Sequence, residues 1–213
     1  MRLSYRVVLL ACASMLVFAA AASANYLANP GFESGDFTGW QVFGNCYVEA
    51  DIPAEPGHYV PYEGDYLAKL FGNFWCENCF NVSGIFQEFD TCPGDEWCFN
   101  VNSRHSGWEP MAGGNWMVQK LAFFDANGIE IPEAASEAII LDAASPVDEW
   151  LINDVIFATA PENAVKVQAL ILFLQPSLDG GAGQVDAACL MYIGGGSSAT
   201  ESSSWGQIKT LFE

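Results

Sequence analysis

The sequence predicts an all-β fold, an antiparallel β-sandwich. From residue 40 onward, short runs rich in β-branched and aromatic residues are separated by Gly, Pro, Asn and Asp. Alternation within these runs is typical of strands with one buried face: in residues 116–123, Lys120 and Leu121 fall on opposite faces. Helical periodicity is scarce in the same region. These observations together favour a sandwich of short antiparallel strands.

Eight or nine strands are expected along the chain. Turn chemistry lies between them at Pro93-Gly94, Asn127-Gly128 and Ser145-Pro146. The expected strands cover residues 40–49, 65–71, 84–89, 96–102, 115–124, 138–141, 150–159, 164–174 and 184–193.

The first 24 residues have the pattern of a secretory signal peptide. Arg2 and Arg6 form a basic start, an apolar run covers residues 7–18, and Ala22-Ser23-Ala24 is a small-residue cleavage site. The alternative, a lipobox-like sequence ending at Cys12, leaves too short an apolar run before the cysteine. We therefore expect a secreted protein that begins at Asn25. No later run reaches the ~20 apolar residues of a membrane span.

Length and charge narrow the class of protein. A chain of 213 residues favours one main domain, and a hydrophobic content of 51% is sufficient for a core. Without residues 1–24, five basic residues face 26 acidic ones, a net charge of −21. Such a surface repels phosphate backbones and anionic membranes, so nucleic-acid binding is excluded. If the partner is a polysaccharide, a neutral one is expected.

Export also changes how the cysteines are interpreted. An even number in an oxidising compartment predicts disulfides, with 15 possible full pairings. A four-thiolate zinc site is the alternative, although its second pair is spaced more widely than usual. A thioredoxin-like redox motif is weaker, because no βαβ pattern surrounds the first pair. The residues concerned are Cys46, Cys76, Cys79, Cys92, Cys98 and Cys189.

The end of the chain differs in composition from the rest. Residues 194–204 form a Gly/Ser-rich linker, and residues 205–213 follow as a short amphipathic tail. Trp205, Ile208, Leu211 and Phe212 would share one helical face. The tail is interpreted either as a docking, sorting or retention peptide, or as a frayed end or one that folds back onto the sandwich.

Several sequence landmarks resemble one known group of proteins. Residues 29–40, Asn-Pro-Gly-Phe-Glu-Ser-Gly-Asp-Phe-Thr-Gly-Trp, resemble the opening "NPGFE-G-GW" of carbohydrate-binding modules of families 4, 9 and 22. Similar landmarks follow in the family's order, at residues 63–70, 84–94, 150–164 and 185–190. The resemblance covers about residues 25–193 and implies a galactose-binding-like jelly roll that binds polysaccharide.

The same resemblance implies a structural calcium ion. Carried over position by position, its ligands are the backbone carbonyls of Gly31 and Gly64 and the carboxylate of Asp186, with Glu33 as an extra ligand. Such a set of hard oxygen donors is of the kind that Ca²⁺ binds.

Sugar recognition needs flat aromatic faces and a few hydrogen-bonding groups, because pyranose rings present apolar C–H faces surrounded by hydroxyls. Aromatic residues in turn-rich segments are the expected contacts, and Arg104, the only arginine after residue 24, is an expected hydrogen-bond donor. The predicted glycan-binding residues are Tyr47, Phe74, Trp75, Trp97, Arg104 and Trp108.

Catalysis is not expected. A glycosidase needs two carboxylates about 5 to 9.5 Å apart, and the 26 acidic residues give no way to select a pair. No G-x-S-x-G or H-E-x-x-H motif is present. The sequence therefore predicts a non-catalytic binding protein. The alternative is a structural or adhesive surface protein in which the sandwich is a spacer and residues 205–213 carry the interaction.

Overall fold

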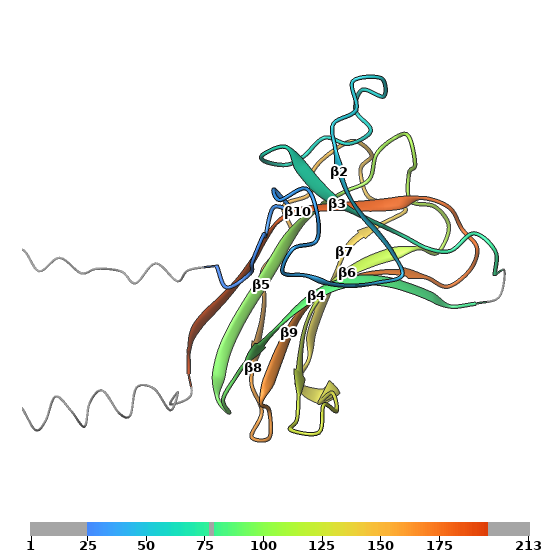
Figure 1. Cartoon of the computed structure of the whole chain (residues 1–213). Coiled ribbons are helices and arrows are strands. Elements are labelled where there is room, and N and C mark those ends of the chain that lie inside the picture. Colours follow the sequence, from blue (N-terminus) through green and yellow to red (C-terminus); the bar gives the residue numbers. More distant parts are fainter. Residues whose placement is uncertain (1–24, 77–78, 196–213) are drawn as a thin grey trace, which may run out of the picture.

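A computed structural model, which describes residues 25–76 and 79–195, confirms an all-β sandwich of two five-stranded antiparallel sheets (Figure 1). The first sheet has the order β1 (Gln41–Phe43), β4 (Asn81–Asp90), β9 (Lys166–Gln175), β6 (Trp116–Phe124) and β7 (Ser136–Asp142). The second has the order β2 (Asn45–Ala50), β3 (Tyr66–Phe71), β10 (Ala182–Gly195), β5 (Asp95–Arg104) and β8 (Ile156–Thr159).

A single 3₁₀ turn, η1 (Pro132–Ala134), is the helical element of the described residues. No helix within 25–76 and 79–195 is long and apolar enough to span a membrane. The predicted signal peptide, most of the linker and the tail lie outside the described residues. β10 runs through Gly195, so the first two residues of the predicted linker belong to a strand.

Strand alternation builds the core between the sheets. In β9, Val167, Ala169, Ile171 and Phe173 are buried, and the residues between them are only partly covered. In β6, Leu121 is buried in the core while Lys120 points away and pairs with Glu130 at 2.7 Å. The opposite faces predicted for Lys120 and Leu121 are thus confirmed.

The segment predicted as one strand over residues 40–49 is two strands in different sheets. Gly44 separates β1 from β2 and adopts a φ of 72°, which is favourable only for glycine. Its Cα packs against Ser83 of β4, so that a Cβ at this position would lie 2.5 Å from the Ser83 hydroxyl. The chain therefore crosses from one sheet to the other at this glycine.

The strand predicted over residues 150–159 is shorter than expected. Only β8 pairs as a strand there, and Leu151 makes an isolated bridge with Ser103. The preceding residues instead form a loop that reaches the outer face of the second sheet.

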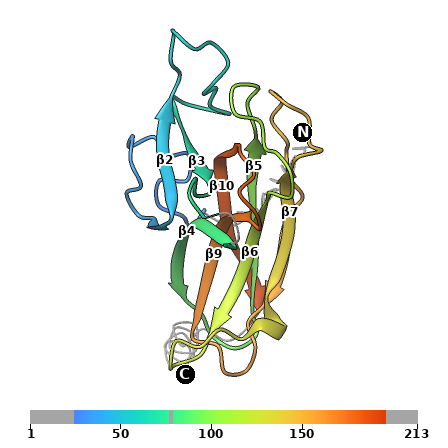
Figure 2. The same ribbon diagram turned by 90° about the vertical axis from the view of Figure 1, so that its right-hand side faces the viewer.

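That outer face carries the candidate site. In β3, Ala68 and Leu70 face the core, so Lys69 and Phe71 face outward. Arg104 of β5 pairs in register with Gln184 of β10 on the same face. Residues 51–65, here called the covering loop, join β2 to β3 and project from one end of the sandwich beside the loop that follows β5 (Figures 1 and 2).

We expect Gly44→Ala to lower the free energy of unfolding by more than the ~1 kcal/mol of an unfavourable φ alone, because its Cβ would also collide with Ser83. The control is Gly128→Ala: φ is 75° there as well, but nothing lies within 4 Å of an added Cβ. Urea unfolding of the two variants measures the difference. Equal losses would mean that the close approach to Ser83 costs nothing.

Candidate functional site

The covering loop is held on the sheet by side chains that donate to its backbone carbonyls. Arg104 donates from Nη2 to the Gly57 carbonyl at 2.8 Å and from Nη1 to the His58 carbonyl at 3.2 Å. Gln184 donates to the same His58 carbonyl at 2.7 Å. A loop crossing a sheet has no strand partner for these carbonyls, so buried polar side chains of the sheet take that role.

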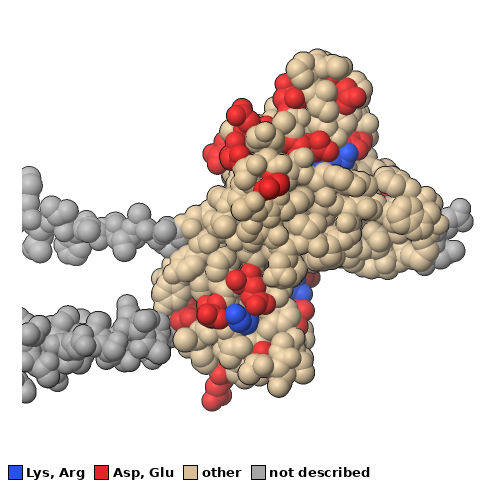
Figure 3. Space-filling view, in the orientation of Figure 1, with Lys and Arg blue, Asp and Glu red and all other residues tan. Residues whose placement is uncertain are grey.

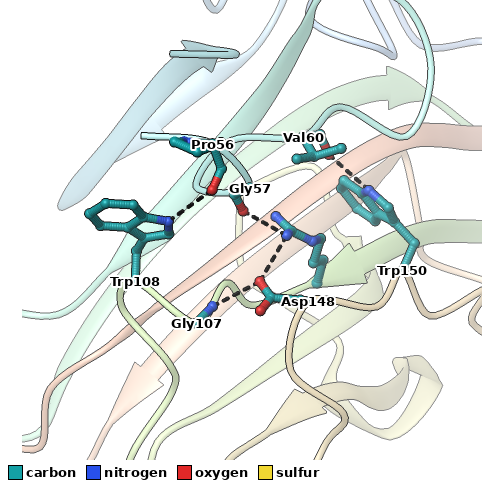
Figure 4. A pocket seen from close by; sticks show the side chains of 8 residues that line it. Pro56, Gly57, Val60, Gly107, Trp108, Asp148 and Trp150 are labelled. Carbon is teal, nitrogen blue, oxygen red and sulfur yellow. Dashed lines mark hydrogen bonds and ion pairs between the residues drawn. The ribbon is translucent and has the colours of Figure 1, made fainter. Parts of the chain in front are cut away.

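Two tryptophans hold the loop at its sides. The Trp108 indole nitrogen donates to the Pro56 carbonyl at 3.2 Å, and the Trp150 indole nitrogen donates to the Val60 carbonyl at 2.9 Å. Figure 4 shows the two rings at opposite sides of the site, each turned toward the loop by this bond. Because the N–H edge is fixed, each ring has a defined orientation.

Arg104 is 2% exposed, although the sequence predicts it as a free glycan-binding donor. Its Nη1 also donates to Gln184 at 2.7 Å, and its Nη2 pairs with Asp148 at 3.0 Å. Burial lowers the pKa of the guanidinium, and Asp148 opposes this effect. Arg104 is therefore primarily a structural residue, engaged with the covering loop, Gln184 and Asp148.

These residues enclose a cleft of about 600 Å³ between the covering loop and the loops after β5 and β7. Among the described residues that line the cleft, Asp148 is the one carboxylate, and its Oδ1 accepts from Arg104 and from the Gly107 amide at 2.9 Å. The lining residues are Pro56, Gly57, Val60, Arg104, Gly107, Trp108, Asp148 and Trp150.

Trp108 presents one open face. Its ring is 54% exposed and stacks on His58, with centroids 5.6 Å apart and planes 17° apart. His58 in turn stacks on Tyr59 at 3.9 Å. The His58 ring thus covers one face of the Trp108 ring, and the other face is free to stack on a flat ligand.

A second group of aromatic residues continues across the same sheet. The Lys69 ammonium lies 5.3 Å from the ring centroids of both Tyr59 and Phe71. Tyr47 stacks on Phe71 with planes 10° apart, and the Phe74 ring lies 5.5 Å from the Phe71 ring, measured between centroids. Tyr47, Lys69, Phe71 and Phe74, here called the aromatic band, are thus joined to the cleft through Tyr59. Trp75 is next in sequence and 78% exposed.

The prediction that Trp97 is an exposed contact is wrong. Trp97 faces the core, is 3% exposed, and packs edge-on against Tyr26 at 5.1 Å and Tyr192 at 5.5 Å. Trp97 shares the inward face of β5 with Phe99 and Val101, which explains this burial.

The disulfide prediction holds for one pair. Cys76 and Cys79 are bonded, whereas Cys46, Cys92, Cys98 and Cys189 are free thiols, so the full framework is not found. Cys46 turns into the sandwich, where burial raises the pKa of its thiol to about 12.

Register keeps Cys98 and Cys189 apart. The Cα partner of Cys98 is Met191 and that of Cys189 is Asn100, so the two cysteines are diagonal neighbours rather than an opposed pair. Diagonal positions are farther apart than the reach of an unstrained disulfide. No cluster of three or more His, Cys, Asp or Glu within residues 25–76 and 79–195 is arranged to hold a metal, so the zinc alternative has no site there.

The residues expected to bind calcium do come together. Asp186 is buried and lies next to Gly31. A Cβ added to Gly31 would be 3.5 Å from Asp186 Oδ1 and 3.9 Å from Glu33 Oε1. A Cβ on Gly64 would collide with the Glu33 carboxylate. Burial raises the pKa of Asp186 to about 6, although it accepts from three backbone amides, among them that of Tyr62 at 2.8 Å.

Acidic residues dominate the charged surface. Figure 3 shows them grouped on the upper lobe and near the lower end, with an uncharged band between the two groups and few basic residues. This distribution agrees with the strong acidic excess of the sequence.

No protein-family model matches the sequence, and a search of curated proteins found no match. Solved structures do match. TmCBM61, solved in complex with β-1,4-galactotriose, is 21% identical with a TM-score of 0.51, over 80% of this chain and 100% of that one. The chain has the β-sandwich fold of carbohydrate-binding modules.

Two further solved structures also match this chain. The enzymatically active domain of tailspike protein 4 from bacteriophage CBA120 is 11% identical with a TM-score of 0.55; the match covers 79% of this chain and 21% of that one. The C-terminal family 22 module of Clostridium thermocellum Xyn10B is 13% identical with a TM-score of 0.47, covering 81% of this chain and 97% of that one. The match to TmCBM61 confirms the carbohydrate-binding-module fold that the sequence landmarks suggest.

The structure brings together residues that the sequence does not single out for binding. Trp150, Asp148 and His58 all lie at the cleft or directly beside it. In the sequence, Trp150 begins a predicted strand and belongs to the family landmark at residues 150–164, and neither role indicates a cleft. Turn signals at Ser145-Pro146 and Pro56-Gly57 were the available clue, because binding residues are concentrated on loops.

We expect Arg104→Gln to destabilise the protein by about 3 kcal/mol, because it removes the charged hydrogen bonds to the loop carbonyls of Gly57 and His58. The control is Lys166→Gln, which removes a solvent-exposed cation from Asp90 and should leave the free energy of unfolding almost unchanged. Urea unfolding compares the two. Similar small losses would show that the covering loop does not depend on the guanidinium.

Proposed function

We propose that this protein is a secreted, non-catalytic polysaccharide-binding protein whose ligand lies in the cleft. One observation carries the proposal. Trp108 and Trp150 are fixed by their indole N–H bonds on opposite sides of a cleft of about 600 Å³. Two aromatic rings of fixed orientation can stack on sugar rings without losing further rotamer entropy, which favours binding.

The ligand is a neutral glycan. Arg104 is the cation of the cleft lining, and its guanidinium is already committed to loop carbonyls, Gln184 and Asp148. Fixed positive charge is therefore not available to hold an acidic polymer, and the acidic surface repels one. The aromatic band formed by Tyr47, Lys69, Phe71 and Phe74 provides a second surface for a chain that extends beyond the cleft.

The geometry also favours binding without catalysis. Asp148, the one carboxylate among the lining residues, is held by Arg104 and the Gly107 amide. Hydrolysis of a glycosidic bond needs a second carboxylate facing the same bond.

Trp108→Ala is expected to weaken glycan retention at least about tenfold, since an exposed tryptophan that lines a binding cleft carries much of the binding energy. The measurement is affinity electrophoresis of residues 25–213 against β-glucan, xylan, mannan and β-1,4-galactan. Ile129→Ala is the control, because Ile129 is 63% exposed in the β6–β7 loop.

A chain ending at residue 195 separates this proposal from the alternative of a tail-borne interaction. Retention that survives removal of residues 196–213 and disappears in Trp108→Ala supports the cleft. Retention by none of the four glycans, with attachment that depends on the tail, would overturn it.

We also propose a structural calcium at Asp186. The described residues fit the ion: Asp186 is buried without a cation partner, and Glu33 and Gly31 lie beside it. Asn102 is opposed to Asp186 across β5 and β10, and its Oδ1 is buried with no hydrogen-bond partner. Ca²⁺ accepts such mixed carboxylate, amide and backbone oxygens. Asp186, Glu33, Asn102 and the carbonyls of Gly31 and Gly64 would hold it.

Calcium should raise the melting temperature of the wild-type protein and leave that of Asp186→Asn unchanged, because the buried carboxylate is the charged ligand. Differential scanning calorimetry with calcium or with chelator measures this. In chelator, the wild-type protein should lose stability as pH rises through about 6, since the pKa of Asp186 is raised in the folded state and its ionised form is disfavoured there. Identical melting curves with calcium and chelator would exclude the site.

A further inference from the structure

His58 lies between two carboxylates. Its Nδ1 is 2.6 Å from Glu55 Oε2 and its Nε2 is 2.8 Å from Glu109 Oε1. Glu55 belongs to the covering loop itself, whereas Glu109 belongs to the loop after β5. The ring therefore adds a side-chain to side-chain link between these two loops, next to the cleft, beside the bond from the Trp108 indole to the Pro56 carbonyl.

Both ring nitrogens of His58 face carboxylate oxygens, so both hydrogen bonds can form only if both nitrogens carry a proton. A neutral imidazole has one N–H and can donate to only one carboxylate; an imidazolium donates to both. The ring also stacks between Tyr59 and Trp108, and a cation is favoured over aromatic faces. The arrangement around His58 is thus complementary to the protonated form.

The other charged groups here do not replace that proton. The Lys69 ammonium pairs with the same oxygen of Glu109 and donates to the Tyr59 hydroxyl at 3.1 Å. Burial alone would lower the pKa of Lys69, but its bonds to Glu109 and Tyr59 outweigh burial and raise it, so Lys69 keeps its charge. Arg104 reaches only the His58 backbone carbonyl. Losing the His58 proton therefore leaves Glu55 without a cationic partner in this cluster.

We propose that His58 is a proton-dependent positioning residue: its imidazolium clasps the covering loop to the loop after β5 and supports Trp108, so that glycan binding strengthens in mildly acidic medium. The binding part of this inference rests on the proposed function; the clasp itself does not. Histidine changes charge between about pH 5 and 8, so the clasp is complete at the acidic end and weakened at the alkaline end.

Hydrogen exchange tests the clasp without any ligand. Amides of residues 52–62 should exchange about tenfold more slowly, after correction for the intrinsic rate, at about pH 5.5 than at about pH 8, the factor for losing one charged hydrogen bond. Amides of the turn at residues 125–130, which contains no histidine, are the internal control.

Two substitutions assign the effect to His58. His58→Asn should remove the pH dependence of exchange in residues 52–62. Glu55→Gln should reduce it, because a glutamine amide can donate to an unprotonated Nδ1 and rebuild the bond at alkaline pH. A full pH dependence in both variants would overturn the clasp.

Glycan affinity gives an independent result. With whichever of the four polysaccharides is retained, wild-type binding should fall about tenfold from about pH 5.5 to about pH 8, and that of His58→Asn should change less than about twofold. Equal affinity of the wild type at both pH values would overturn the proposed role in binding. If hydrogen exchange in residues 52–62 depends on pH but none of the four glycans is retained, the clasp is supported and the proposed function is refuted.

Discussion

The backbone carbonyls of the covering loop are the constraint on which the site depends. A loop that lies across the outer face of a sheet removes its own carbonyls from water without giving them strand partners. Here the partners are the guanidinium of Arg104, the amide of Gln184 and the indoles of Trp108 and Trp150. Satisfying the loop therefore orients the same two tryptophans that make the walls of the cleft.

The same constraint explains the use of arginine in an acidic chain. Lysine carries its charge at a single point, whereas the planar guanidinium of Arg104 reaches two carbonyls, Gln184 and Asp148 at once. Asp148 in turn accepts a hydrogen bond from the backbone amide of Gly107, the residue before Trp108. A single buried charge thus links the covering loop, the loop after β5 and the loop after β7.

Alternation and turn chemistry predicted the sandwich because each strand must bury one face, as Lys120 and Leu121 illustrate. Burial of individual aromatics was less accessible: Trp97 lies in a predicted strand, and the strand prediction alone does not say which of its two faces is buried. No sequence pattern marked Gly44 as a break between strands. Its positive φ and its close approach to Ser83 nevertheless divide the strand predicted over residues 40–49 into β1 and β2. The cleft joins Pro56, Arg104 and Trp150, which only tertiary structure brings together.

The predicted calcium position and the cleft are mechanically related through the covering loop. Asp186 accepts from the amides of Tyr62 and Glu63, at the end of the loop that leads into β3, while His58 and Arg104 hold its middle. An ionised, buried carboxylate without a cation is unfavourable, so the metal-free form is less well anchored at that end. Calcium would therefore act on the cleft by fixing a loop end, whereas Arg104 supplies a permanent anchor and His58 one that depends on pH.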